Sequence, residues 1–235
     1  MTALLTSVRD LEEAYDAAAA GADLLDLKEP RAGALGALPA HTVRQVVQAV
    51  RRGWPGLPLS ATIGDHAAGE HAAMLRMADM IGGCGVDYVK VGLAPGPHAG
   101  AALEQLARLP WQVVPVFLAD HGLDLALVAY ACALGFPAVM ADTEDKQAGS
   151  LFDCVGHATL ASMIGSASAL GCKVGLAGAL RLEHVPQLRA LAPDIAGFRS
   201  ALCEGARASR LAPAKVRALR AALSGQAEAA AIQAA

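Results

Sequence analysis

Eight short apolar segments recur along the chain, and alanine-rich stretches typical of helices separate them. From Leu4 to Ile195 their spacing averages about 27 residues, roughly what a strand, its loops and a covering helix require. The pattern predicts strands over residues 4–8, 24–28, 59–63, 88–93, 112–118, 138–142, 173–176 and 195–200. The chain therefore consists of a repeated strand–helix unit.

Most of these segments are apolar at consecutive positions, which is typical of a parallel sheet that helices bury on both faces. Eight units at this spacing favour closure into a barrel over an open doubly wound sheet. We therefore predict an α/β fold, a single (β/α)₈ TIM barrel over residues 1–225. The alanine-rich tail of residues 226–235 either extends the last helix or frays, and we assign it no function.

A short motif before alternate strands supports this interpretation. Gly21-Ala22-Asp23, Gly85-Val86-Asp87 and Gly135-Phe136-Pro137 each follow a helical stretch and precede an apolar segment, and Ala192-Pro193-Asp194 is a looser copy. Glycine at such a position is typical of a helix C-terminus. We expect the aspartate or proline to form the tight entry into the strand.

Composition excludes several classes of function. Hydrophobic residues make up 54% of the chain, charged residues make up 17%, and the net charge is −3, so nothing indicates a basic face for nucleic acid. No apolar run is long enough for a membrane helix, and the N-terminus does not resemble a signal peptide. Five single cysteines indicate neither a zinc site nor a disulfide framework. We expect a cytoplasmic protein and leave open a homo-oligomer.

Lysines and aspartates interrupt three predicted strands near their C-terminal ends, where (β/α)₈ barrels carry their active sites. Asp26 and Lys28 end the second strand, Lys90 lies in the fourth, and Asp142 ends the sixth, with Lys146 four residues later. Side chains alternate along a strand, so Asp26 and Lys28 point the same way. A lone lysine at a strand end is usually a surface residue, but charges within apolar strands are costly unless they are paired. The pattern predicts one charged cluster.

Clustered lysines suit imine chemistry, because an amine attacks a carbonyl only when it is neutral. A second ammonium about 5 Å away costs about 3 kcal/mol at an effective dielectric near 20, equivalent to about two pKa units. Such a shift makes a lysine a nucleophile or a base near neutral pH. Neighbouring carboxylates can balance the charge and move protons. The residues therefore favour a Schiff-base enzyme, as in class I aldolases.

A phosphate site is expected at the loops after the seventh and eighth strands, where TIM barrels often bind phosphate through backbone N–H groups. Gly178 and Gly197 would let the backbone approach the ligand, with Arg199 supplying charge and Ser200 beside it. The alternative is two ordinary glycine turns. Residues 31–36 are expected to form a flexible covering loop that touches a second phosphate.

Three other functions stay open at this point. The chain could be a Schiff-base aldolase or lyase acting on a different sugar phosphate, or a phosphosugar isomerase that works by proton transfer alone. It could also be a non-catalytic barrel that binds a phosphorylated metabolite as a regulator.

The segments that carry these residues follow one another along nearly the whole chain. They are residues 21–30 (GADLLDLKEP), 33–36 (GALG), 60–65 (SATIGD), 87–93 (DYVKVGL), Asp142-Thr143 with Lys146, 151–153 (LFD), 176–178 (LAG) and 194–199 (DIAGFR). As a set, they resemble the (5-formylfuran-3-yl)methyl phosphate synthase family of methanofuran biosynthesis. Each segment alone is a weak signal, and the set is specific.

The resemblance implies condensation of two molecules of a triose phosphate, glyceraldehyde 3-phosphate, into a furan aldehyde phosphate, with release of phosphate and water. It implies no metal and no organic cofactor. Matched by position, Lys28 is the Schiff-base lysine and Lys90 the proton acceptor. Asp26, Asp142 and Lys146 match further active-site positions of the family.

Overall fold

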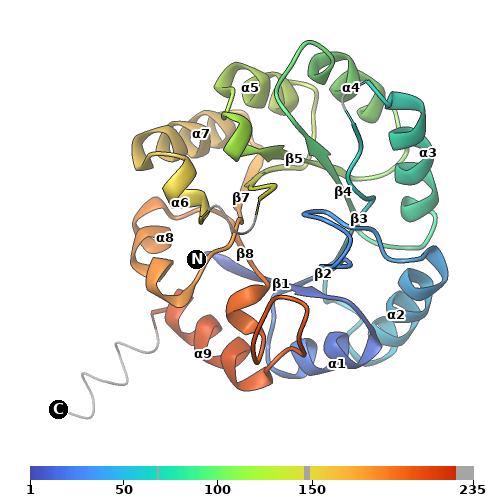
Figure 1. The fold of residues 1–235 in the computed structure, drawn as a ribbon, viewed down its shortest axis with the longest axis vertical. Coiled ribbons are helices and arrows are strands. Elements are labelled where there is room, and N and C mark those ends of the chain that lie inside the picture. The colour runs from blue at the N-terminus through green and yellow to red at the C-terminus, as the bar shows by residue number, and fades with distance from the viewer. Residues whose placement is uncertain (68, 146–148, 226–235) are drawn as a thin grey trace.

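Eight parallel strands close into a barrel in the computed structural model, which describes residues 1–67, 69–145 and 149–225 (Figure 1). The strands pair in chain order, and β8 closes the ring against β1 with Ile195 opposite Ala3. The predicted TIM barrel is confirmed. The strands are β1 (Ala3–Val8), β2 (Leu24–Leu27), β3 (Leu59–Thr62), β4 (Tyr88–Leu93), β5 (Val113–Leu118), β6 (Ala138–Asp142), β7 (Lys173–Leu176) and β8 (Ile195–Phe198).

Helices surround the barrel as an outer ring (Figure 1). The helices of the described residues are α1 (Leu11–Ala19), α2 (Ala40–Gly53), α3 (His71–Gly82), α4 (Ala99–Leu106), α5 (Leu125–Ala133), α6 (Leu151–Cys154), α7 (His157–Ala169), α8 (Val185–Leu191) and α9 (Pro213–Leu223), with the short 3₁₀ helices η1 (Ala119–His121), η2 (Leu182–His184) and η3 (Ser200–Leu202). Among them, none has both the length and the apolar character that a membrane span requires. The tail of residues 226–235 lies outside the described residues.

The repeated motif before alternate strands has a clear structural reason. Gly21, Gly85 and Gly135 take the left-handed conformation after a helix, with φ of +88°, +88° and +86°. The aspartate of the motif then accepts a hydrogen bond from a backbone N–H at the start of the preceding strand. Asp23 accepts from Leu4 at 2.9 Å, Asp87 from Leu59 at 2.7 Å, and Asp194 from Val174 at 2.8 Å. The motif therefore ties β2, β4 and β8 to the strands before them.

Alternate residues of the strands face two separate apolar layers. On β5, Val113 and Phe117 belong to the large core between the strands and the helices. Val114, Val116 and Leu118 belong to a smaller cluster, which also contains residues of β6 and Ala177, directly after β7. This alternation follows from the period of two along a strand, and it places the smaller cluster inside the barrel.

The segment after β2 contributes to this interior cluster. Leu35 is fully buried and lies against Gly92 of β4, where an added Cβ would lie 2.5 Å from Leu35 Cδ1. Only a glycine at that position leaves space for the leucine. We expected residues 31–36 to form a flexible cover, but Leu35 instead anchors them by filling part of the barrel mouth.

Candidate active site

Asp26 is the centre of a polar cluster inside the barrel and is fully buried. Its Oδ1 accepts a hydrogen bond from Ser60 Oγ at 2.7 Å. Its Oδ2 accepts from Lys90 Nζ at 3.0 Å and from Ser7 Oγ at 3.3 Å. The donors come from β3, β4 and β1, so the barrel closure itself assembles the site. Both carboxylate oxygens are satisfied, which offsets the cost of burying the charge.

Two buried lysines share one oxygen of this carboxylate. Lys90 is 2% exposed and Lys28 is 6% exposed. Lys28 Nζ lies 3.9 Å from Asp26 Oδ2, the same atom that Lys90 Nζ contacts at 3.0 Å. The two nitrogens therefore lie no more than 6.9 Å apart. The structure thus brings Asp26, Lys28 and Lys90 together, as the alternation along β2 and the position of Lys90 in β4 predict.

The electrostatics of Asp26 follow from these neighbours. Burial raises the pKa of Asp26, but the charges of Lys90 and Lys28 and the hydrogen bond from Ser60 outweigh it. The pKa of Asp26 therefore lies below its ordinary value of 3.8, and the group is a carboxylate at neutral pH. Lys90 lies within hydrogen-bond distance of this carboxylate, whereas Lys28 does not.

A second carboxylate faces the same cavity from the end of β6. Asp142 is 1% exposed, and its Oδ1 accepts a hydrogen bond from the N–H of Thr143 at 2.8 Å. The following segment is held in place by Asp120, which accepts hydrogen bonds from the N–H groups of Glu144 and Asp145. Lys146, the third predicted lysine, lies outside the described residues.

One cavity at the C-terminal end of the barrel unites the predicted residues that the structure describes. Its lining includes the charged cluster and parts of the loops after β7 and β8. The predicted residues in the lining are Asp26, Lys28, Lys90, Asp142, Gly178, Gly197, Arg199 and Ser200.

The backbone after β7 has the features of an anion site. Gly178 and Ala179 both have positive φ, at +107° and +45°, and the second value is unusual for a residue with a Cβ. A Cβ at Gly178 would lie 3.0 Å from Thr143 Cγ2. Within the described chain, the N–H groups of Gly178 and Ala179 donate to no other residue. Ser200 lines the same cavity and begins η3, so its N–H has no partner within that helix.

Arg199 has a different place from the predicted one. Its Nε donates to the carbonyl oxygen of Arg207, and its Nη1 donates to the carbonyl of Ser7 and to Glu13. Its Nη2 donates to Glu13 Oε1 at 3.1 Å and to the carbonyl of Ser209 at 2.9 Å. These bonds use all five N–H groups of the guanidinium. The prediction that Arg199 binds phosphate does not fit this arrangement, in which Arg199 clamps the segment after β8 to β1 and α1.

Arg207 faces the cavity instead, and the sequence analysis missed it. It lines the cavity together with the cluster around Asp26, and its Nη2 donates to the carbonyl of Gly33 at 3.3 Å. Burial lowers the pKa of Arg207, while the negative charge of Asp142 opposes that shift. The signal that could have revealed it is an arginine between Gly205 and Ser209, in a turn that follows the eighth strand.

A metal site is not evident in the described part of the chain. No group of three or more histidine, cysteine, aspartate or glutamate side chains there has an arrangement that could hold a metal ion.

A family model and individual relatives of known name point to the same protein family. The family model described as 4-HFC-P synthase matches residues 4–220. A protein of Methylorubrum extorquens, provisionally named (5-formylfuran-3-yl)methyl phosphate synthase, is 38% identical over 200 residues, which are 85% of this chain and 82% of that protein. Proteins of that name from Methanosarcina mazei and Methanocaldococcus jannaschii are 34% and 32% identical. They cover 88% and 86% of this chain, and 93% and 90% of their own lengths.

Solved structures support the fold. Phosphoribosyl anthranilate isomerase from Thermus thermophilus superposes with a TM-score of 0.69 at 19% identity, over 96% of this chain and all of that one. A 3-hexulose-6-phosphate synthase superposes with a TM-score of 0.60 at 21% identity, over 92% of this chain and 98% of that one. At these identities, the likeness concerns the barrel alone.

Proposed function

The chain belongs to the 4-HFC-P synthase family, and we propose that it condenses two molecules of glyceraldehyde 3-phosphate into (5-formylfuran-3-yl)methyl phosphate. The balanced reaction releases one phosphate and two molecules of water, so the enzyme acts as a carbon–oxygen lyase. The product would serve the synthesis of a methanofuran-type C1 carrier. A cytoplasmic location and a homo-oligomer remain predictions.

The observation that carries this proposal is the shared oxygen of Asp26. One carboxylate can neutralise one ammonium, and Lys90 holds the shorter contact, at 3.0 Å. A second ammonium within 6.9 Å costs about 2 kcal/mol at an effective dielectric near 20. Burial disfavours that charge further. We therefore assign the neutral amine to Lys28 and the resting ammonium to Lys90.

In the proposed first steps, the Lys28 amine adds to the aldehyde carbon of one triose phosphate. The Lys90 ammonium gives a proton to the resulting hydroxyl, which leaves as water and forms the iminium. Lys90 is then neutral and accepts the α-proton, which gives an enamine. Asp26 stays close to both nitrogens and stabilises each ammonium in turn. The enamine then attacks the second aldehyde, and loss of phosphate and two further dehydrations lead to the furan, with Asp142 assisting proton transfer. Hydrolysis of the imine consumes one water and returns Lys28 as the free amine.

The loops after β7 and β8 supply the proposed phosphate site. Gly178 and Ala179 line the same cavity as Ser200. Backbone N–H groups in such a turn bind phosphate without needing a cation. This position leaves the rest of the substrate directed toward the lysines.

A product analysis tests the proposed function. Purified protein is incubated with glyceraldehyde 3-phosphate and followed for ultraviolet absorption by a furan aldehyde and for free inorganic phosphate. The proposal expects both to appear with equal stoichiometry. An adduct without furan would indicate an aldolase for a different sugar phosphate, and binding without any product would indicate a regulatory barrel.

A further inference from the structure

Arg207 is held by a short arm, the residues 199–211 that follow β8. Cys203 and Leu211 form an antiparallel bridge, and the N–H of Glu204 donates to the carbonyl of Arg210 at 2.9 Å. At the turn, the Ser209 hydroxyl accepts from the N–H of Gly205 at 2.9 Å. The arm is therefore a closed and internally bonded hairpin.

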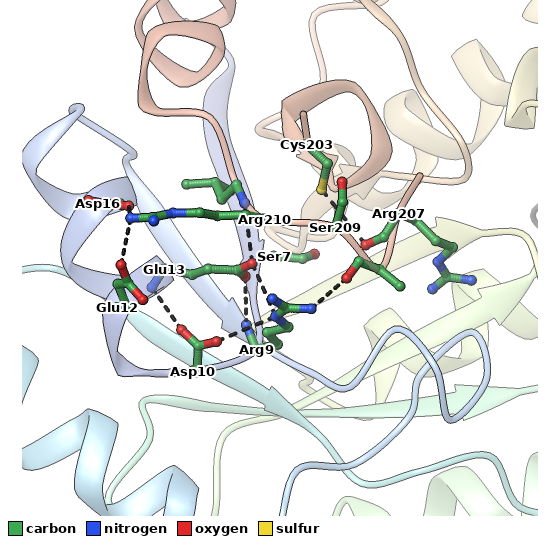
Figure 2. A network of polar contacts seen from close by, with 12 residues as sticks. Ser7, Arg9, Asp10, Glu12, Glu13, Asp16, Cys203, Arg207, Ser209 and Arg210 are labelled. Atoms are coloured by element: carbon green, nitrogen blue, oxygen red, sulfur yellow. Dashed lines mark hydrogen bonds and ion pairs between the residues drawn. The ribbon is translucent and has the colours of Figure 1, made fainter. Parts of the chain in front are cut away.

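Arg199 fixes this arm to the barrel. The acceptors of its guanidinium are backbone carbonyls on the arm and on β1, together with Glu13 of α1, which is 1% exposed. Figure 2 shows Glu13 and Ser7 close together and the guanidinium of Arg207 pointing away from them. The carbonyl of Arg207 is thus clamped while its side chain extends toward the cavity.

Most of the donors of Arg207 remain available. Of its five N–H groups, one donates to a described residue, the carbonyl of Gly33 on the opposite side of the mouth. Arg207 forms no ion pair with a carboxylate of the described residues. A partly buried guanidinium with unused N–H donors can bind an anion. Its planar arrangement of N–H groups suits phosphate, which accepts two parallel hydrogen bonds from it.

The charges of the cavity lead to the same conclusion. With Lys28 neutral, Lys90 is paired with Asp26, and Arg199 is paired with Glu13. Among the described lining residues, Arg207 is then the cation that forms no ion pair with a carboxylate. Asp65, Glu144 and Asp145 line the outer hollow beside it, so an anion is favoured on the inner side, in the cavity that Lys28 and Lys90 line.

We infer that Arg207 forms a second phosphate subsite at the mouth of the cavity, which holds the phosphomonoester of the second substrate molecule. This inference rests on the proposed function, which needs two triose phosphates at once. The first phosphate occupies the backbone turn at Gly178 and Ala179, and the second lies between Arg207 and Lys28. Arg207 thereby selects a phosphorylated second aldehyde over an unphosphorylated one.

The test compares Arg207→Met with Arg210→Met, a matched arginine on the same arm whose partners are Glu12 and Asp16 at the surface. Equilibrium dialysis with labelled orthophosphate is expected to show two sites in the wild type and in Arg210→Met. Arg207→Met should lose one site or bind it about 10- to 100-fold more weakly. Arg207→Lys keeps the positive charge but loses the planar guanidinium, so it should bind phosphate with intermediate affinity.

Kinetics with glyceraldehyde 3-phosphate separate this inference from the proposed function. Arg207→Met should form the borohydride-trapped Lys28 adduct normally, since that step needs one substrate, and should need at least about 10-fold more substrate for furan formation. Two full phosphate sites in Arg207→Met would overturn the inference whatever the wild type produces. Absence of furan from the wild type, together with two phosphate sites of which one depends on Arg207, would overturn the function alone.

Discussion

The two sides of the barrel interior have opposite chemistry. Strands β1 to β4 contribute Ser7, Asp26, Ser60 and Lys90 to one buried hydrogen-bonded cluster. Strands β5 and β6 and the residue after β7 contribute an apolar wall, with Asp142 as a charged residue at the end of β6. The members of that wall are Val114, Val116, Leu118, Ala138, Met140 and Ala177, together with Ala34 and Leu35 from the segment after β2.

We interpret this difference as a division of roles, in which the charged side serves function and the apolar side serves stability. Apolar residues of similar volume are often as stabilising as a buried ion pair, or more so, because desolvating two charges is costly. The charged side is therefore better explained by chemistry than by folding. The apolar side stabilises the barrel and also lowers the local dielectric, which strengthens every interaction among the charges opposite.

The largest effect is expected for Lys28→Met. The variant should lose furan formation by at least about a thousandfold, because no other amine can replace the nucleophile. Its free energy of unfolding should change by less than about 1 kcal/mol, since Asp26 keeps its bonds to Lys90 and Ser60. Steady-state assays and urea unfolding measure the two quantities. Lys173→Met, at the exposed start of β7, is the control and should keep wild-type activity.

Asp26→Leu should destabilise the protein by about 3 to 5 kcal/mol, because it removes the carboxylate that the buried Lys90 ammonium contacts. Adding Lys28→Met and Lys90→Met to it should restore most of that stability without restoring activity. A triple variant as unstable as Asp26→Leu would show that the charges are needed for folding and would contradict the separation described above.

Asp26 should also make the stability of the wild type depend on pH in the acid range. The folded pKa of Asp26 is below 3.8, so the folded state binds fewer protons than the unfolded state as the pH falls through that range. The contribution of Asp26 to stability is therefore complete above its ordinary pKa and is lost as the pH falls toward the folded pKa. In the triple variant, urea unfolding at a series of pH values should show a shallower loss.

On the apolar side, Met140→Ala should have the reverse effects of Lys28→Met. Met140 is 2% exposed and fills the space beside Gly175, where an added Cβ would lie 2.7 Å from Met140 Cγ. The cavity left behind should cost about 2 to 5 kcal/mol of stability. The turnover number should stay within a few-fold of the wild type at temperatures where the variant is folded. A large loss of turnover in fully folded protein would mean that the two sides are coupled.

The smallest effect is expected for Ser60→Ala, which removes one hydrogen bond to Asp26 Oδ1. Losing this buried bond should cost about 1 to 2 kcal/mol. The pKa of Asp26 should rise toward its ordinary value, because one of the causes that lower it is gone. NMR titration of the carboxylate measures this shift, and an unchanged pKa would show that the lysines alone determine it.

Periodicity predicted the fold well, because most residues of the strands are buried and most of the longer helices are amphipathic or alanine-rich. The predicted strand bounds differ from the observed ones by at most two residues. The convergence of Lys28, Lys90 and Asp26 was also predictable, since strand alternation and the position of the C-terminal ends determine where such side chains point.

The arginines were not predictable in the same way. Glu13 lies 186 residues from Arg199 and has the sequence signature of a helix N-terminus, so nothing local indicates that they pair. Arg207 belongs to an irregular arm, whose direction depends on the bonds made by Arg199 rather than on periodicity. Leu35 likewise looked like a loop residue, because the space that it fills is created by Gly92 on a different strand.

The central claim is that Lys28 becomes a neutral nucleophile because Lys90 takes the carboxylate that they share. Borohydride trapping in the presence of glyceraldehyde 3-phosphate, followed by peptide mass spectrometry, tests it directly. The account predicts a reduced triose phosphate adduct on Lys28, absent from Lys28→Met and still formed, more slowly, in Lys90→Met. An adduct on Lys90 in the wild type, or furan formation without any adduct, would contradict it.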